Sequence, residues 1–448
     1  MDGPKLSAPA RLGRRLIGGL RIGPGEAGPV LLAFAYFFCL LCAYYILRPI
    51  RDEMGIQGGV GNLQWVFTAT FGVMLVAVPV FGWAVAHFPR RRLVPLVYYF
   101  FIANLLVFFA LFEARIAAPW VARGFFVWVS VFNLFVVSVF WSFMADLFTN
   151  AQARRLFGFI AAGGSFGAIV GPGLTALLAE RLGPTPLILI SVGLLGTAVL
   201  CVHGLLHLDR RSPARDDPDG AARDGPIHGS PFAGAARVAR SPYLLGIGAF
   251  TVLYTTLSTF LYFEQAHIVA GAFSKAGDRT TLFATIDLAV NVLTVLAQLF
   301  VVARLVERFG LAATLALVPL GVAVGFAVLG LYPTLAVLVV FQVVRRAGNY
   351  ALTRPAREML YTVVPREDKY KSKNFNDTVV YRGGDALSGW AFALLRAAGL
   401  GLAALAWLAV PVALLWAALG VALARHQEVL RRPADRQPPR LSRSGERS

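Results

Sequence analysis

Long apolar segments, separated by short polar ones, follow one another along almost the whole chain. About twelve of them have the roughly 20 apolar residues that an α-helix needs to cross about 30 Å of hydrocarbon. Because lipid offers no partners for backbone N–H and C=O groups, a chain with so many spans must cross as helices. The pattern predicts an all-α polytopic membrane protein. The expected spans are 29–49, 63–86, 93–113, 120–147, 156–180, 184–207, 243–268, 281–303, 311–331, 334–362, 376–395 and 400–424.

One long polar segment, residues 208–242, interrupts this pattern in the interior of the chain. Its content of Pro, Gly, Asp and Arg is typical of a flexible linker. It separates six spans from six, which predicts two six-helix bundles at 29–207 and 243–425, with a basic segment at 1–28 and a basic tail at 426–448. In such an arrangement the two bundles rock about a site near the middle of the membrane.

Two short basic turns and a row of glycines add to this picture. The turns "GWAVAHFPRRRL" and "VARLVERFGLAA" resemble the loop signature of the major facilitator superfamily. In the fifth span, Gly163, Gly167 and Gly171 recur every four residues along one helical stripe, which predicts close packing against another helix. No strand precedes them and no Gly-Lys-Ser or Gly-Lys-Thr follows, so a phosphate-binding loop is not expected.

The distribution of charge indicates the orientation of the chain. Of its residues, 57% are hydrophobic and 15% are charged, and the net charge is +18. With the N-terminus in the cytoplasm, inward-facing segments hold 29 of the 42 Lys and Arg residues and outward-facing ones about 8, as the positive-inside rule requires. Both termini are therefore expected in the cytoplasm. Contact with anionic lipid accounts for the positive charge, so nucleic acid is not an expected partner.

The tenth span carries arginines at membrane depth, where a charge costs at least about 2.5–3.5 kcal/mol and therefore indicates function. At 100° per residue, Arg346, Tyr350, Arg354 and Arg357 fall within one arc of the helix. Pro355 is expected to kink the helix within this face.

The first span ends in a similar string, "AYYILRPIRDEMG", in which Tyr44, Arg48 and Arg51 share a face. Both spans thus carry the order Arg-Pro-x-Arg-acid. For Arg48, Arg51 and Arg357, snorkelling or ion pairing at a helix end is an alternative to substrate binding.

Acidic residues in or near the spans could neutralise this charge or couple to transport, namely Asp146, Glu264, Asp287, Glu358 and Asp385. We expect Arg382 and Asp385 to pair through one helix turn. Glu264 and Asp287 should be paired or exchange protons. The balance remains positive, which suits an organic anion, since Arg binds phosphate bidentately and stacks on rings. The predicted substrate-binding residues are Tyr44, Arg48, Trp141, Arg346, Asn349, Tyr350, Arg354, Arg357 and Arg382.

The stretch "PAREMLYTVVPREDKYKSKNFNDTVVYRGGD" resembles the signature of the ATP/ADP translocase family of plastids and intracellular bacteria, within the major facilitator superfamily. That family has a Pro-x-Lys-Glu-Met-x-Tyr string, a Glu-x-Lys-x-Lys-x-Lys run, then Asp-x-Val and an Arg-Gly turn. The matching residues are Pro355, Arg357, Glu358, Met359, Tyr361, Glu367, Lys369, Lys371, Lys373, Asp377, Val379 and Arg382. The sequence departs in Arg357, where the family has Lys, and in the Gly-Gly-Asp that follows Arg382. Other segments, such as "TFLYFEQAHIV", look more like bacterial relatives.

The resemblance implies a secondary transporter that exchanges ATP/ADP-like organic phosphates across the bacterial inner membrane by alternating access. We expect a monomer without a cofactor. Two alternatives remain open: a generic exporter or proton-coupled carrier, in which Asp146, Glu264 or Asp287 titrates, and a membrane sensor or partner subunit without transport. An enzyme is not expected, because no paired catalytic acids and no nucleophile with a base are visible. Scattered histidines and three cysteines within apolar helices give no metal-ligand spacing.

Overall fold

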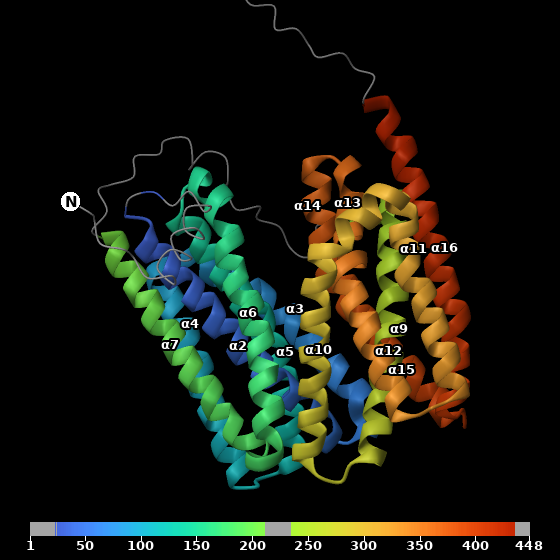
Figure 1. Cartoon of the computed structure of the whole chain (residues 1–448), viewed down its shortest axis with the longest axis horizontal. Helices are drawn as coiled ribbons and strands as arrows, with labels where there is room; N and C mark the ends of the chain where they lie inside the picture. Colours follow the sequence, from blue (N-terminus) through green and yellow to red (C-terminus); the bar gives the residue numbers. More distant parts are fainter. Residues whose placement is uncertain (1–22, 24, 211–233, 435–448) are drawn as a thin grey trace, which may run out of the picture. The chain divides into compact units, whose positions relative to one another are not determined.

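The computed structural model describes residues 23, 25–210 and 234–434, and these residues form helices and no strands (Figure 1). The predicted basic segment at 1–28, linker at 208–242 and tail at 426–448 lie in large part outside the described residues. The first long helices are α2 (Ala27–Gln57), α3 (Leu63–His87), α4 (Arg90–Glu113), α5 (Ala118–Leu147), α6 (Asn150–Leu182) and α7 (Pro184–Arg210). They are followed by α8 (Ala235–Arg240), α9 (Pro242–Ala272), α10 (Ala276–Phe300), α11 (Val302–Leu331), α12 (Leu335–Gly348), α13 (Arg354–Leu360), α14 (Arg366–Phe375), α15 (Tyr381–Ala397) and α16 (Leu402–Ala434). Shorter helical segments are η1 (Val60–Asn62), η3 (Asn349–Thr353), η4 (Tyr361–Val363) and η5 (Asn376–Val380).

Among the described residues, 11 helices are long and apolar enough to cross a membrane, and they overlap every predicted span except 376–395. That span is helical too, but it is divided into the π-helical η5 and α15, which has only 17 residues. Its charged residues Arg382 and Asp385 make it less apolar than the other spans. The prediction of an all-α polytopic membrane protein with about twelve spans is confirmed.

Contacts divide the chain into two compact units. The first comprises Met1–His228 and Gln265–Val292, and the second comprises Gly229–Glu264 and Leu293–Ser448. The end of α9 and most of α10 therefore pack with the first unit, although both helices continue into the second. The division into six-helix bundles at 29–207 and 243–425 stays a prediction.

In the first unit, α2 is the central helix and packs against α5, α6 and α7 (Figure 1). Its first 21 residues, 27–47, carry no charge, so this part can be buried on several sides at once. Aromatic rings fill the space between α2 and α5: Phe37 stacks on Phe140 with ring centroids 4.0 Å apart. The hydroxyl of Tyr36 donates to that of Tyr98 on α4, which satisfies a polar group in the core.

Helix α6 approaches α2 more closely than side chains would allow, along the predicted glycine stripe. A Cβ atom on Gly167 would lie 2.4 Å from the carbonyl oxygen of Phe38, and one on Gly163 would lie 2.5 Å from that of Phe34. Gly171 meets the α2 backbone in the same way. The two backbones thus touch where only glycine fits, and the predicted close packing is confirmed.

In the second unit, α11 and α16 form the most extensive helix pair and lie side by side in Figure 1. Gly420 on α16 permits this approach, since a Cβ atom there would lie 3.2 Å from the Leu315 carbonyl oxygen. Trp416 is fully buried and its ring lies 5.3 Å from that of Phe250 on α9. These contacts hold α9 against the pair and leave its other faces for α12, α13 and α15.

The glycine stripe can be tested by adding one methyl group. Gly167→Ala should lower the stability of the protein by about 1–3 kcal/mol, because the new Cβ atom forces α6 away from α2. Gly173→Ala is the matched control on the same helix, where a Cβ atom meets nothing within 4 Å. It should be neutral or gain up to about 1 kcal/mol from helix propensity. The measurement is thermal unfolding in detergent, and equal stability of the two variants would contradict the close packing.

Candidate functional site

One face of α9 carries the polar contacts to the tenth predicted span. The hydroxyls of Thr251, Tyr254 and Ser258 share this face, since they are three and four residues apart. Ser258 Oγ lies 3.1 Å from Arg345 Nη1, and the Tyr254 hydroxyl accepts from the Asn349 amide at 3.0 Å. The α9 side of this span is therefore lined by hydroxyl groups rather than by apolar side chains.

The tenth span contains a wider helical turn directly before the proline at which a kink was expected. Residues Asn349–Thr353 form a π-helical segment directly before Arg354 and Pro355. Pro355 has no N–H, and its ring crowds the carbonyl group of Ala351 four residues earlier, a conflict that a wider turn relieves. The wider turn also rotates the residues that follow it relative to those that precede it.

This rotation changes which arginines share a face. Arg345, before the π-helical segment, and Arg357, after it, both reach α9, where Arg357 Nη1 lies 3.5 Å from Thr251 Oγ1. Arg354 is exposed, and Arg346 and Tyr350 are half-buried. A regular α-helix, with 100° per residue throughout, would place Arg346, Arg354 and Arg357 on one face. The π-helical turn between Arg346 and Arg354 changes that spacing.

Arg345 is the residue that the sequence analysis missed. Its side chain is 7% exposed, Nη2 donates to Gln342 Oε1 at 2.9 Å, and Nε has no hydrogen-bond partner. Its hydrogen bonds within the described residues go to the neutral side chains of Gln342 and Ser258. A guanidinium group stays charged at this depth. A signal existed in the sequence, because Gln342 precedes Arg345 by one helical turn in an apolar stretch.

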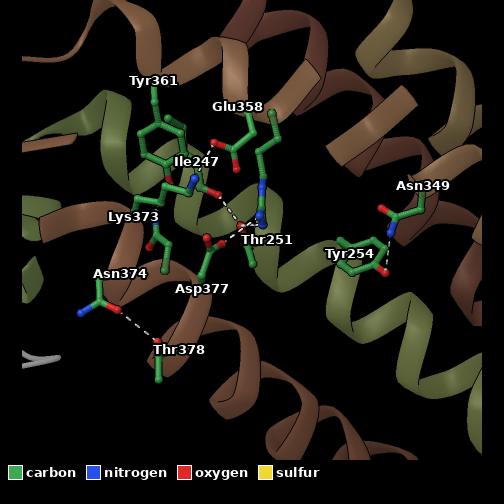
Figure 2. A network of polar contacts seen from close by, with 12 residues as sticks. Ile247, Thr251, Tyr254, Asn349, Glu358, Tyr361, Lys373, Asn374, Asp377 and Thr378 are labelled. Atoms are coloured by element: carbon green, nitrogen blue, oxygen red, sulfur yellow. Dashed lines mark hydrogen bonds and ion pairs between the residues drawn. The ribbon is translucent and has the colours of Figure 1, made fainter. Parts of the chain in front are cut away.

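Several charged and polar side chains between Pro355 and Asp385 contact one another (Figure 2). Arg357 Nη2 donates to Asp377 at 2.8 Å, and Lys373 donates to Glu358 at 2.7 Å. The Tyr361 hydroxyl accepts from Asn376 at 2.9 Å. These contacts tie the end of the tenth span to α14 and η5. Arg357 thus shows the ion pairing that was the alternative to substrate binding.

Helix α15 lies against another face of α9. Arg382 and Asp385 form the expected pair one turn apart at 3.6 Å, and Asp385 also accepts from Thr259 at 3.1 Å. A Cβ atom on Gly384 would lie 2.4 Å from Thr255 Oγ1, so α15 and α9 are in close contact. Both Arg357 and Arg382 therefore have carboxylate partners, whereas Arg345 has none among the residues that the structure describes.

Glu264, on α9, is a second buried charged residue for which the described residues show no partner of opposite charge. It is 1% exposed, and neither of its carboxyl oxygens has a hydrogen-bond partner among the described residues. It also marks the point on α9 where the chain passes from the second unit to the first. A buried carboxyl group without partners is far less costly in its neutral, protonated form.

The first unit holds the remaining predicted residues. Arg48 on α2 pairs with Asp287 on α10 at 3.6 Å, as expected for a buried carboxylate. Tyr44 is buried with its ring 5.1 Å from that of Tyr45. Trp141 belongs to the aromatic packing around Phe37 and Phe157, whereas Asp146 is exposed. Arg48 thus belongs to an ion pair, Tyr44 and Trp141 to aromatic packing, and Asp146 to the surface.

A bidentate ion pair holds the start of α10 against α2. Arg279 Nε and Nη2 each lie 2.7 Å from an oxygen of Glu53, which is 0% exposed, and Arg279 Nη1 donates to the Phe273 carbonyl at 2.8 Å. The Asn291 amide donates to the Ala168 carbonyl at 2.6 Å. These contacts explain why Gln265–Val292 packs with the first unit.

Residues 30–341 match the Major Facilitator Superfamily. The chain belongs to this superfamily. Its membership supports secondary transport of a small molecule by a multi-pass membrane protein, and not an enzymatic role. No curated protein matches the chain significantly in sequence.

Solved transporters share the fold at low identity. The nucleoside transporter NupG is 14% identical with a TM-score of 0.60, covering 91% of this chain and 99% of that one. A bacterial homologue of the iron transporter ferroportin in an inward-facing state is 15% identical with a TM-score of 0.61, covering 89% and 98%. A POT family transporter in complex with 5-aminolevulinic acid is 10% identical with a TM-score of 0.62, covering 89% and 96%. The ATP/ADP translocase branch stays a prediction from the sequence.

The Glu53–Arg279 pair can be tested by a double-mutant cycle with Glu53→Gln and Arg279→Gln. Each single variant leaves one buried partner unmatched and should lose about 3–5 kcal/mol of stability, and the double variant should lose less than the two combined. The control pair is Arg91 and Asp209, which lie 2.6 Å apart with Arg91 57% exposed. There the coupling should be about 0–1 kcal/mol. Additive losses at Glu53 and Arg279 would show that the two side chains are not coupled.

Proposed function

We propose that the protein is a secondary transporter of organic anions, and that it exchanges nucleotides such as ATP and ADP across the cell inner membrane. The observation that carries the proposal is Arg345, a buried guanidinium group hydrogen-bonded to neutral side chains. A buried charge without a counter-charge is strongly unfavourable, so an anion from outside the protein would relieve it.

The surroundings of Arg345 favour an anion with an aromatic part. Tyr254, one turn before Ser258 on α9, has its ring centroid 6.0 Å from that of Tyr381 on α15. Arginine binds phosphate or carboxylate oxygens through two parallel N–H groups, and tyrosine rings stack on flat bases. The Asn349 amide, already bonded to Tyr254, could turn to the edge of a base.

The charge of Arg345 also favours exchange of one anion for another over one-way transport. An empty site holding Arg345 would be costly, while a bound phosphate would neutralise it and favour the loaded state during the conformational swing. The resemblance of residues 355–385 to the ATP/ADP translocase family supports nucleotides as the anion. We further propose that both termini lie in the cytoplasm, as the basic residues indicate, and that one copy suffices for transport.

Uptake of radiolabelled ADP and ATP into proteoliposomes, with and without nucleotide inside, tests the proposal. The wild-type protein should take up label at least about tenfold faster with internal nucleotide. Arg345→Gln should lower this exchange about tenfold or more, because it removes one charge-assisted contact of about 1.5–3 kcal/mol. Arg345→Lys keeps the charge but loses the bidentate geometry, so it should fall between the two.

The control is Arg396→Gln, since Arg396 is exposed at the end of α15 and bonds to the Leu400 carbonyl. It should exchange nucleotide as the wild type does. Uptake that does not respond to internal nucleotide or any other organic phosphate would refute the exchange of organic phosphates. Full activity of Arg345→Gln would refute Arg345 as the anion site.

A second candidate function is proton-coupled transport, which one observation favours. Glu264 is buried without hydrogen-bond partners on α9, in the same unit as Arg345. A carboxyl group placed in this way can carry a proton across the membrane only if it gains access to water during the cycle.

Glu264→Gln separates the two functions. In the exchanger, nucleotide exchange should survive this change and show little dependence on pH, since a neutral amide replaces a neutral acid. In a proton-coupled carrier, uptake driven by an inward proton gradient should be abolished. Glu113→Gln, at the exposed end of α4, is the control and should leave both readouts unchanged.

A further inference from the structure

A groove of about 850 Å³ opens between α3 and α4 in the first unit, with α5 as its floor. Both α3 and α4 pack against α5 but scarcely touch each other. The walls are apolar and largely aromatic, and they include Trp65, Val73, Phe100, Phe108, Val127 and Val131. All three helices are long and apolar enough to cross the membrane, so the groove lies at lipid depth.

The length of the groove matches one leaflet of a bilayer. On α3 it runs from the residue before the helix, Asn62, to Val73, and on α5 from Trp120 to Val131. Each stretch rises by about 16 Å at 1.5 Å per residue. The hydrocarbon core is about 30 Å thick, so half of it is about 15 Å. The groove begins at the N-terminal ends of α3 and α5 and ends about halfway along both helices, so in helices that cross the membrane it would extend from one surface to about the midplane.

The mouth of the groove is polar and carries a positive charge. Arg123 Nε donates to the Gly58 carbonyl at 2.7 Å, and its guanidinium group lies 4.6 Å from the centre of the Trp120 ring. Among the residues that the structure describes, Arg123 has no acidic partner, so its terminal N–H groups can donate to an anion. Trp65 and Trp120 are 58% and 71% exposed here, at the level where tryptophan rings favour the headgroup region.

We propose that this groove binds a membrane phospholipid, with one acyl chain between α3 and α4 and the phosphate group on Arg123. The apolar walls fit the chain, the leaflet length fits its extent, and the charge at the mouth fits the phosphate. A neutral hydrophobic molecule would leave Arg123 without an anion. The bound chain would fill the space that α3 and α4 leave between them. This site is independent of the transport site at Arg345.

Native mass spectrometry of the purified full chain tests the proposal with two probes, phosphatidylglycerol and diacylglycerol of the same acyl chains. The wild-type protein should retain phosphatidylglycerol about tenfold more strongly, as expected for one charge-assisted contact. Arg123→Gln should remove this preference. Arg115→Gln, an exposed arginine in the turn before α5, is the matched control and should keep it.

Filling the groove should weaken the binding of both lipids. Gly124→Leu adds a side chain to the floor, where a Cβ atom makes only ordinary contact, 3.9 Å from Phe108. Ala69→Leu fills the same space from α3 and serves if the first variant unfolds at a lower temperature. The proposal is overturned if the wild type holds both probes equally, if both filled variants retain phosphatidylglycerol as the wild type does, or if a neutral molecule occupies the groove instead.

Discussion

Polar groups inside a membrane must find their partners within the protein, and most features of this chain follow from that constraint. The backbone meets it by forming helices. Hydroxyl groups meet it locally, as Thr251 does by donating to the Ile247 carbonyl at 3.0 Å one turn earlier. Buried charges meet it through distant partners, as in the pair of Glu53 and Arg279. A buried charge that lacks an opposite charge is therefore the feature that most needs an explanation.

Among the residues that the structure describes, Arg345 and Glu264 are buried without an ion-pair partner, and their charge types are opposite. Arg345 keeps its charge and is bonded to neutral groups, which favours a ligand that brings an anion. Glu264 can become neutral by taking a proton, so its burial needs no ligand. Burial without a bound counter-ion is therefore more unfavourable for the arginine than for the acid. This difference is the physical reason for ranking anion exchange above proton coupling.

The sequence predicted the features that depend on local pattern. Apolar length located the spans, and the four-residue spacing of Gly163, Gly167 and Gly171 predicted the contact between α6 and α2. It failed where geometry depends on tertiary structure. A π-helical turn before Pro355 rotates Arg354 and Arg357 relative to Arg345 and Arg346, and a fixed helical period does not contain this turn. Arg279 is paired with a residue 226 positions away, and only the folded chain brings them together.

The contact of α6 with α2 differs in kind from the contact of α9 with the tenth span, and this difference bears on where a substrate can bind. In the first unit, α6 meets the backbone of α2 through glycines, and no ligand can enter that contact without separating the helices. In the second, α9 presents hydroxyl groups to Arg345 and Asn349. A hydroxyl can exchange one hydrogen-bond partner for another at little net cost, since the two bonds are similar in strength. A polar ligand could therefore replace these contacts while the helices stay packed, which favours the α9 face as the place where substrate is recognised.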